Sequence, residues 1–313
     1  MLSLISLGGT ISMLSSGEGA IPSLNANDLT NSFKDINAIT FSNISSPNIT
    51  FSMLLEVLAL AKEEIKKGSR AVIITQGTDT LEESAFFCNL FWDLDEPLIF
   101  TGAMKNPSEL GSDYLANINS AIILANSDLA KGLGVLCVLN ESVHSANFIH
   151  KSNTFSLETF TSFNRGLVGE IKEDKFYLFN NFYKRLKLEL PKEINKKVAL
   201  LKMCLDYDDD LLKFASDNYD GIVISGYGAG HVMAKNMPCI KNIKKPIIMT
   251  SRCESGKTGL KTYGYAGAEI DLAKNGVIMS EYLSDVKARI LLLVALSLGF
   301  NKDQIQDLIK QFN

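Results

Sequence analysis

The amino-acid sequence predicts an α/β protein in which a parallel sheet covered by helices is followed by a second α/β unit. Short apolar runs alternate with segments of helical periodicity along most of the 313 residues, which is typical of parallel strands connected by helices. Residues 170–197 break this alternation with a stretch rich in lysine, asparagine and aromatic residues. We interpret that stretch as a hairpin plus a linker, because a new alternating run follows it.

The expected strands are short apolar runs. They are Leu2–Leu7, Ala71–Thr75, Leu98–Phe100 and Gly134–Leu139 before the linker, and Val198–Leu201, Gly221–Ser225 and Pro246–Thr250 after it. The expected helices are Phe51–Lys67, Leu81–Phe91, Tyr114–Ala125, Asp210–Ser216 and Asp285–Leu298. Two of them have an apolar face at helical spacing, made by Leu54, Leu55, Leu58, Ala61 and Ile65 and by Ala288, Leu291, Leu292 and Ala295.

Composition excludes several classes of partner. The net charge is −4, from 31 basic and 35 acidic residues, so we expect no nucleic-acid partner. No apolar run reaches the roughly 18 residues of a membrane span, so we expect no membrane partner. The start, MLSLISLGGT, lacks the basic region of a signal peptide, which predicts a cytoplasmic protein. The five cysteines form no CxxC pair, so no metal site is expected.

Two of the expected strands end in clusters of glycine, hydroxyl and acidic residues. The first is followed by Gly8-Gly9-Thr10, and the second runs into Thr75-Gln-Gly-Thr-Asp-Thr80. Ligands of open parallel sheets bind at the carboxyl ends of strands. Glycines there let backbone N–H groups approach a substrate and hold an oxyanion, and a threonine hydroxyl beside them can attack a carbonyl. The same residues are equally typical of strand-to-helix turns with N-caps.

Seven segments then occur in a fixed order: LGGTIS, TQGTDTLEES, TGAMK, NESVHSANFIHKSNTFS, GYGAG, TSRCESG and VKAR. This series, from about Leu4 to Leu298, resembles the bacterial-type L-asparaginases and glutaminase-asparaginases. The resemblance implies a larger N-terminal parallel-sheet domain, residues 1–190, and a smaller C-terminal α/β domain, residues 198–313. It also implies a homodimer or homotetramer that hydrolyses asparagine or a closely related small amide to the acid and ammonia, with no metal and no organic cofactor.

The resemblance also assigns the catalytic residues. It implies that Thr10 of the GGT motif is the primary nucleophile and that Thr78, Asp79 and Lys151 form a second triad. Lysine could serve as a base if burial lowered its pKa, whereas a neighbouring carboxylate would keep it charged. The sequence leaves the balance of these two effects open, and without the motif Lys151 would be read as a surface lysine.

Substrate contacts are carried over in the same way. Ser46 resembles the serine that holds the substrate carboxylate, and Asp79 also binds the substrate amino group. Gly9 and Gly77 are expected to offer their backbones to the substrate. Glu269 stands where the family places a glutamate that reaches the partner subunit's site. His231 stands where an asparagine usually follows GAG, and it is equally well read as a charge-switching substrate contact or as a loop histidine.

The flexible loop expected after the GGT motif departs from the family pattern. A tyrosine that hydrogen-bonds the nucleophilic threonine belongs just before Ile-Pro, but this chain has Ala20 there. Losing such a partner typically costs about 10²–10⁴-fold in rate. Three hypotheses follow: Tyr227, Tyr263 or Tyr265 fills the gap, the alanine makes room for a larger amide, or the protein binds an amino acid without catalysis.

Overall fold

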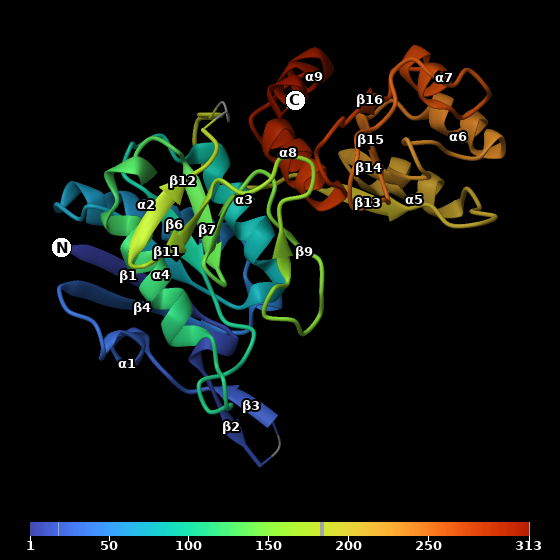
Figure 1. Cartoon of the computed structure of the whole chain (residues 1–313). Helices are drawn as coiled ribbons and strands as arrows, with labels where there is room; N and C mark the ends of the chain where they lie inside the picture. Colours follow the sequence, from blue (N-terminus) through green and yellow to red (C-terminus); the bar gives the residue numbers. More distant parts are fainter. Residues whose placement is uncertain (18, 182–184, 313) are drawn as a thin grey trace. The chain divides into compact units, whose positions relative to one another are not determined.

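The computed structural model describes residues 1–17, 19–181 and 185–312, which form two compact units. The first unit is Met1–Leu188 and the second is Glu189–Asn313. Each contains its own sheet (Figure 1), and each is considered by itself. All strands and helices expected from the sequence form, and their ends shift by at most two residues.

The first unit is built on an eight-stranded sheet in the order β12-β11-β8-β7-β6-β5-β1-β4. Its strands are β1 (Leu2–Gly8), β4 (Ile36–Ile44), β5 (Val72–Thr75), β6 (Leu98–Thr101), β7 (Val135–Leu139), β8 (Ser142–Ser145), β11 (Gly169–Lys172) and β12 (Lys175–Leu178). The strands from β4 to β7 pair in parallel, as predicted. The remaining three extend the sheet with antiparallel pairs.

Two tight turns account for the antiparallel part. Asn140 and Glu141 connect β7 to β8, and Glu173 and Asp174 connect β11 to β12; all four residues have positive φ. Two consecutive positive-φ residues suit a two-residue hairpin turn of the primed type, which can only join antiparallel neighbours. A hairpin was expected around residue 170, and the structure shows that it pairs with the sheet through β8.

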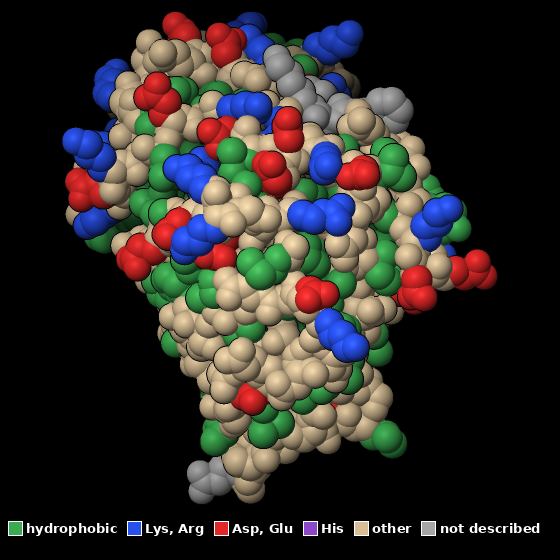
Figure 2. Space-filling view, turned by 90° about the vertical axis from the view of Figure 1, so that its left-hand side faces the viewer, with side chains coloured by type: hydrophobic (Ala, Val, Ile, Leu, Met, Phe, Trp, Pro, Cys, Tyr) green, Lys and Arg blue, Asp and Glu red, His purple; other side chains and the backbone are tan. Residues whose placement is uncertain are grey.

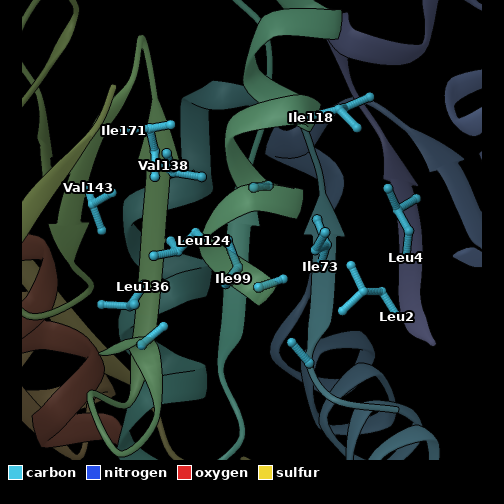
Figure 3. Close-up of a cluster of buried hydrophobic side chains, with 14 of the residues drawn as sticks. Leu2, Leu4, Ile73, Ile99, Ile118, Leu124, Leu136, Val138, Val143 and Ile171 are labelled. Carbon is cyan, nitrogen blue, oxygen red and sulfur yellow. The ribbon is translucent and has the colours of Figure 1, made fainter. Parts of the chain in front are cut away.

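Helices cover both faces of this sheet. They are α1 (Ala26–Thr30), α2 (Phe51–Lys66), α3 (Leu81–Phe91) and α4 (Tyr114–Asn126). Figure 3 shows Ile118 and Leu124 of α4 lying over Leu4, Ile73 and Ile99 of the strands. Burying each such aliphatic side chain contributes roughly 1.5–3 kcal/mol. This packing holds the parallel strands in register, so their carboxyl ends stay side by side.

The buried face of α2 is rotated slightly from the predicted face. Its buried residues are Leu54, Val57, Leu58, Ala61 and Glu64, whereas Leu55 and Ile65 are only partly buried. Glu64 is tolerated there because its Oε2 accepts hydrogen bonds from Ser3 Oγ and Asn37 Nδ2, each at 2.7 Å. Burial acts to raise the pKa of this carboxyl, but the hydrogen bonds from Ser3, Lys67 and Asn37 outweigh it and hold the pKa below its usual 4.5.

Replacing Glu64 by glutamine is therefore expected to destabilise the first unit. An amide cannot accept all three bonds, so the free energy of unfolding should fall by about 1–3 kcal/mol at pH 7. A lowered folded pKa means that this stabilisation is present above the unfolded pKa and is lost as pH falls through the folded one. Urea unfolding at several pH values should thus show the difference shrinking below about pH 4.5. A difference that stays constant down to pH 3 would contradict this account.

The second unit has a four-stranded parallel sheet in the order β13-β14-β15-β16. Its elements are β13 (Val198–Lys202), β14 (Gly221–Gly226), β15 (Ile247–Ser251), β16 (Ile278–Met279), α5 (Asp210–Asn218), α6 (Met237–Asn242), α7 (Glu269–Lys274), α8 (Asp285–Ser297) and α9 (Lys302–Ile309). Buried residues of α5, α6 and α7 join one core with the sheet. On α8, Leu292 packs so close to Gly221 that a Cβ there would lie 2.9 Å from it, which explains the glycine.

The surface in Figure 2 carries cationic and anionic side chains intermixed, in keeping with the small net charge of −4. Within the described residues, no helix combines the length and the apolar character needed to cross a bilayer.

Candidate active site

The carboxyl ends of β1 and β5 bring two glycine motifs into contact. These neighbouring strands pair in parallel with Ser6 opposite Thr75, so the residues that follow them meet. A Cβ on Gly9 would lie 2.0 Å from the Gly77 backbone nitrogen, and Gly9 also has a φ of +85°. A side chain at Gly9 is therefore excluded both by space and by backbone conformation. The GGT and GTD motifs form one surface, as their shared place at the strand ends predicts.

Ser46 completes this contact from a third segment. It begins a 3₁₀ helix, Ser46–Asn48, and is 2% exposed. A Cβ on Gly77 would lie 2.8 Å from the Ser46 hydroxyl oxygen. The Ser46 carbonyl also accepts a 2.9 Å hydrogen bond from the Thr80 hydroxyl. The structure thus brings Gly9, Gly77 and Ser46 together.

Thr10 lies directly beyond this contact. It begins the 3₁₀ helix Thr10–Ser12, follows Gly9 in sequence and is partly exposed. Ser12, at the end of that helix, is fully buried. The short helix therefore anchors one end of the motif and leaves Thr10 partly exposed beside the paired glycines.

Lys151 connects the second motif to a distant part of the chain. It lies on the two-residue strand β9 (His150–Lys151), which pairs with β10 (Phe160–Thr161). Its Nζ donates to Thr78 Oγ1 at 2.9 Å and to Asp79 Oδ1 at 2.8 Å. The lysine side chain is 16% exposed and the aspartate 63%. This arrangement fixes the direction of the Thr78 hydroxyl and pairs the ammonium with a carboxylate that remains open to a ligand.

A pocket of about 370 Å³ adjoins this pair, lined by Asp79, Glu82, Lys151 and residues 152–154. Glu82 was not singled out from the sequence. It lies one helical turn after Asp79, and its Oε2 lies 3.1 Å from His150 Nδ1. A spacing of three residues on a helix places both carboxylates on one side. This spacing is the sequence signal from which Glu82 could have been predicted as a neighbour of Asp79. Among the described residues, no group of three or more His, Cys, Asp or Glu side chains could hold a metal ion.

The segment around Ala20 is a hairpin rather than the expected loop. It consists of β2 (Met13–Ser16) and β3 (Gly19–Pro22), and Ser15 pairs with Ala20. The Ser15 backbone N–H donates to Ser108 Oγ at 3.1 Å. Ala20 is exposed and offers only a methyl group.

Glu269 and His231 lie in the second unit, where they contact each other. Glu269 begins α7 and is fully buried. Its Oε2 lies 2.9 Å from His231 Nε2, and the Tyr265 hydroxyl lies 2.8 Å from His231 Nδ1. Of the other tyrosines considered, Tyr263 packs against the His231 ring and Tyr227 donates to the Cys204 carbonyl. The predicted site residues thus form two clusters, one in each unit.

Comparison with known proteins identifies the family. The family model "Asparaginase, N-terminal" matches residues 1–184, and "Glutaminase/Asparaginase C-terminal domain" matches residues 197–309. The chain belongs to the asparaginase family. It is an amidohydrolase, as the order of the seven motifs predicts.

Similarity to individual members of the asparaginase family supports this assignment. An L-asparaginase of Bacillus licheniformis is 34% identical over 259 residues, covering 81% of this chain and 80% of that protein. The crystal structure of a probable cytoplasmic L-asparaginase from Campylobacter jejuni superposes with a TM-score of 0.88 at 25% identity, covering 99% of this chain and 98% of that one. A glutamyl-tRNA(Gln) amidotransferase component of Methanosphaera stadtmanae is 30% identical, covering 84% of this chain and 65% of that protein.

Proposed function

We propose that this amidohydrolase converts L-asparagine to L-aspartate and ammonia through Thr10 as the nucleophile. The observation that carries the proposal is the convergence of Gly9, Gly77 and Ser46 beside Thr10, with Lys151 bonded to both Thr78 and Asp79. The related L-asparaginases support the substrate. The Campylobacter jejuni structure supports a cytoplasmic location. We also propose a homodimer or homotetramer that needs no metal or organic cofactor.

In this proposal, the substrate ends are held by different motifs. Asp79 is exposed and accepts the α-ammonium group, while the Ser46 hydroxyl donates to the α-carboxylate. Thr10 Oγ1 attacks the side-chain amide carbon, and the backbone N–H groups beside Gly9 and Gly77 stabilise the oxyanion. The C–N bond then breaks, and the nitrogen leaves as ammonia with the proton that the Thr10 hydroxyl lost on attack. Water then releases aspartate from the threonine ester and restores the Thr10 hydroxyl. Thr78, oriented by Lys151, directs that water.

A second candidate substrate is a larger or modified amide. The pocket beyond Asp79 and Lys151 favours it, because that pocket leaves space next to the proposed substrate position. The alanine at position 20, where the family has a tyrosine, also motivates it. One relative is named as an amidotransferase component rather than as an asparaginase, which supports the idea that members of the family differ in substrate. Both candidates share the same threonine chemistry.

An ammonia assay with the purified full chain tests the substrate. We expect release from L-asparagine at a rate above that from L-glutamine, β-aspartyl peptides and glycosylated asparagine. Ammonia release from a larger amide with a higher kcat/KM than from asparagine would select the second candidate. No turnover of any amide would overturn both.

A further inference from the structure

The second unit contains a buried carboxylate, an imidazole and an exposed phenol that are joined by hydrogen bonds. Glu269 is fully buried, the His231 side chain is 12% exposed and Tyr265 is 55% exposed. Glu269 Oε2 lies 2.9 Å from His231 Nε2, and Tyr265 Oη lies 2.8 Å from His231 Nδ1. All three residues belong to the second unit, so this triad is complete within it. Tyr265 is the member of the triad that molecules in solution can reach.

The direction of the protons in the triad follows from the acceptor at its buried end. An ionised carboxylate only accepts hydrogen bonds, so His231 donates to Glu269 through Nε2–H. The neutral ring then has its lone pair on Nδ1, which accepts the hydroxyl proton of Tyr265. A hydroxyl bonded to an imidazole that is itself oriented by a carboxylate is the arrangement that makes serine a nucleophile in hydrolases. Here the hydroxyl is that of a tyrosine, which can also form covalent intermediates.

The surroundings of Glu269 keep it in the charged form that this order requires. Burial acts to raise the pKa of its carboxyl, but the backbone N–H donors around it, with His231, outweigh burial and hold the pKa below its usual 4.5. Glu269 Oε1 accepts hydrogen bonds from the backbone N–H groups of Thr262 and Tyr263 at 2.7 and 2.6 Å. One carboxylate oxygen is therefore anchored to the backbone, and the other is left for the imidazole.

The imidazole is held in place on its ring and on its backbone. The rings of Tyr263 and Tyr265 contact it edge-on, with centroids 5.2 and 5.5 Å from that of His231. The backbone of His231 exchanges two hydrogen bonds of 2.9 Å with that of Tyr227. Fixed contacts of this kind keep Nδ1 directed at the Tyr265 hydroxyl.

Other tyrosines of the second unit lack such a base. Tyr263 is 47% exposed and packs against the same imidazole, but Nδ1 is bonded to Tyr265 and Nε2 to the carboxylate. The Tyr227 hydroxyl donates to the backbone carbonyl of Cys204, which accepts a hydrogen bond but does not remove a proton. Tyr207 is buried, and burial raises its pKa. Exposure and a bonded base thus coincide at Tyr265.

We propose that Tyr265 is a nucleophile that takes an acyl group from activated aryl esters, with His231 as its base and Glu269 as the residue that positions His231. Tyr265 Oη bonds to the ester carbonyl carbon while its proton passes to His231 Nδ1, and the resulting imidazolium is paired with Glu269. The bond between the acyl carbon and the aryl oxygen then breaks, and the imidazolium gives its proton to that oxygen.

Hydrolysis of the tyrosine ester completes the cycle. The oxygen of a water molecule bonds to the acyl carbon, one water proton passes to His231, and the imidazolium returns it to the departing Tyr265 oxygen. The products are a carboxylic acid and the restored phenol. Every group in this sequence belongs to the second unit, so the proposed esterase activity is independent of the threonine chemistry in the first.

Acetylation by p-nitrophenyl acetate tests the proposal on the purified full chain. Carrying out the reaction in the Thr10→Ala variant removes acylation of the proposed threonine nucleophile. Tyr263 and Tyr265 share the tryptic peptide 262–274, so fragment ions in mass spectrometry measure both acetylation rates in one sample. We expect Tyr265 to be acetylated about 10²-fold faster than Tyr263, as is typical of a hydroxyl with a general base. Equal rates would mean that both are merely exposed phenols and would overturn the proposal.

Two matched variants locate the activity. Tyr265→Phe should remove the fast phase of p-nitrophenol release, whereas Tyr263→Phe, which also loses one hydroxyl beside the imidazole, should keep it. Both side chains are about half exposed, so both variants should fold. A fast phase that persists in Tyr265→Phe would overturn the assignment of the nucleophile.

His231→Gln tests the base, and Tyr263 serves as its internal standard. Loss of the base should slow acetylation of Tyr265 by about 10²-fold and leave the slow acetylation of Tyr263 unchanged. A purely structural effect would instead change the exposure, and hence the rate, of both tyrosines. Acetylation of Tyr265 at its original rate in His231→Gln, or equal changes at both tyrosines, would overturn the role of the imidazole.

Discussion

Replacing Thr10 by alanine is expected to abolish ammonia release, with kcat lowered on the order of 10⁴-fold or more, as for other lost nucleophiles. The alanine keeps the backbone of the 3₁₀ helix Thr10–Ser12 and removes only the hydroxyl and one methyl group. Thr10 is partly exposed, so the cost in folding free energy should be small. Steady-state kinetics and a thermal melt on the same preparation separate loss of chemistry from loss of fold.

Thr10→Ser is the matched control, because it keeps the hydroxyl and removes the methyl group. It should retain measurable turnover, and it should form the same acyl ester intermediate. Mass spectrometry after rapid acid quench should find the added mass on the peptide that contains residue 10 in wild type and in Thr10→Ser, but not in Thr10→Ala. Unchanged turnover in Thr10→Ala would remove this residue from the mechanism.

Local sequence patterns predicted the regular elements of the fold well, because buried strands and amphipathic helices have strong signatures. The edge strand β4 was missed because its residues, INAITFSNI, are mostly half-buried and carry polar side chains. The hairpin of β11 and β12 was expected, but strand β8, which joins that hairpin to the sheet, was missed because it depends on the backbone of the turn at Asn140-Glu141. Turn conformation at non-glycine residues has little sequence signal.

The candidate site depends even more on contacts between distant residues. The sequence indicated that the two glycine motifs should meet, because both follow strands of one parallel sheet. Nothing local indicated that Lys151 would bond to Thr78, 73 positions away; only the ordered motifs did. The chain from Glu269 through His231 to Tyr265 was also beyond local patterns. His231 and Tyr265 are 34 positions apart, and the tyrosine lies in a glycine-containing loop rather than in a helix or strand.

Replacing Lys151 by methionine is expected to lower kcat by about 10²–10⁴-fold, because the Thr78 hydroxyl loses the donor that orients it. Asp79 also loses its counter-charge. It should then attract the substrate ammonium at least as strongly, so KM should rise little or fall while kcat collapses. A variant in which KM rises and kcat is kept would instead assign Lys151 to substrate binding.

Lys172→Met provides the matched control for Lys151→Met. Lys172 is also paired with a carboxylate, that of Glu141, but both side chains are about half exposed, with Lys172 at the end of β11 and Glu141 in the turn between β7 and β8. Exposed pairs of this kind contribute about 0–1 kcal/mol, so Lys172→Met should keep wild-type kinetics. Lys151 differs from Lys172 in two ways: its side chain is only 16% exposed, and it donates a second hydrogen bond, to a threonine hydroxyl. If both variants kept full activity, the contact of Lys151 with Thr78 would be structural, and the release of aspartate would have to rely on another group.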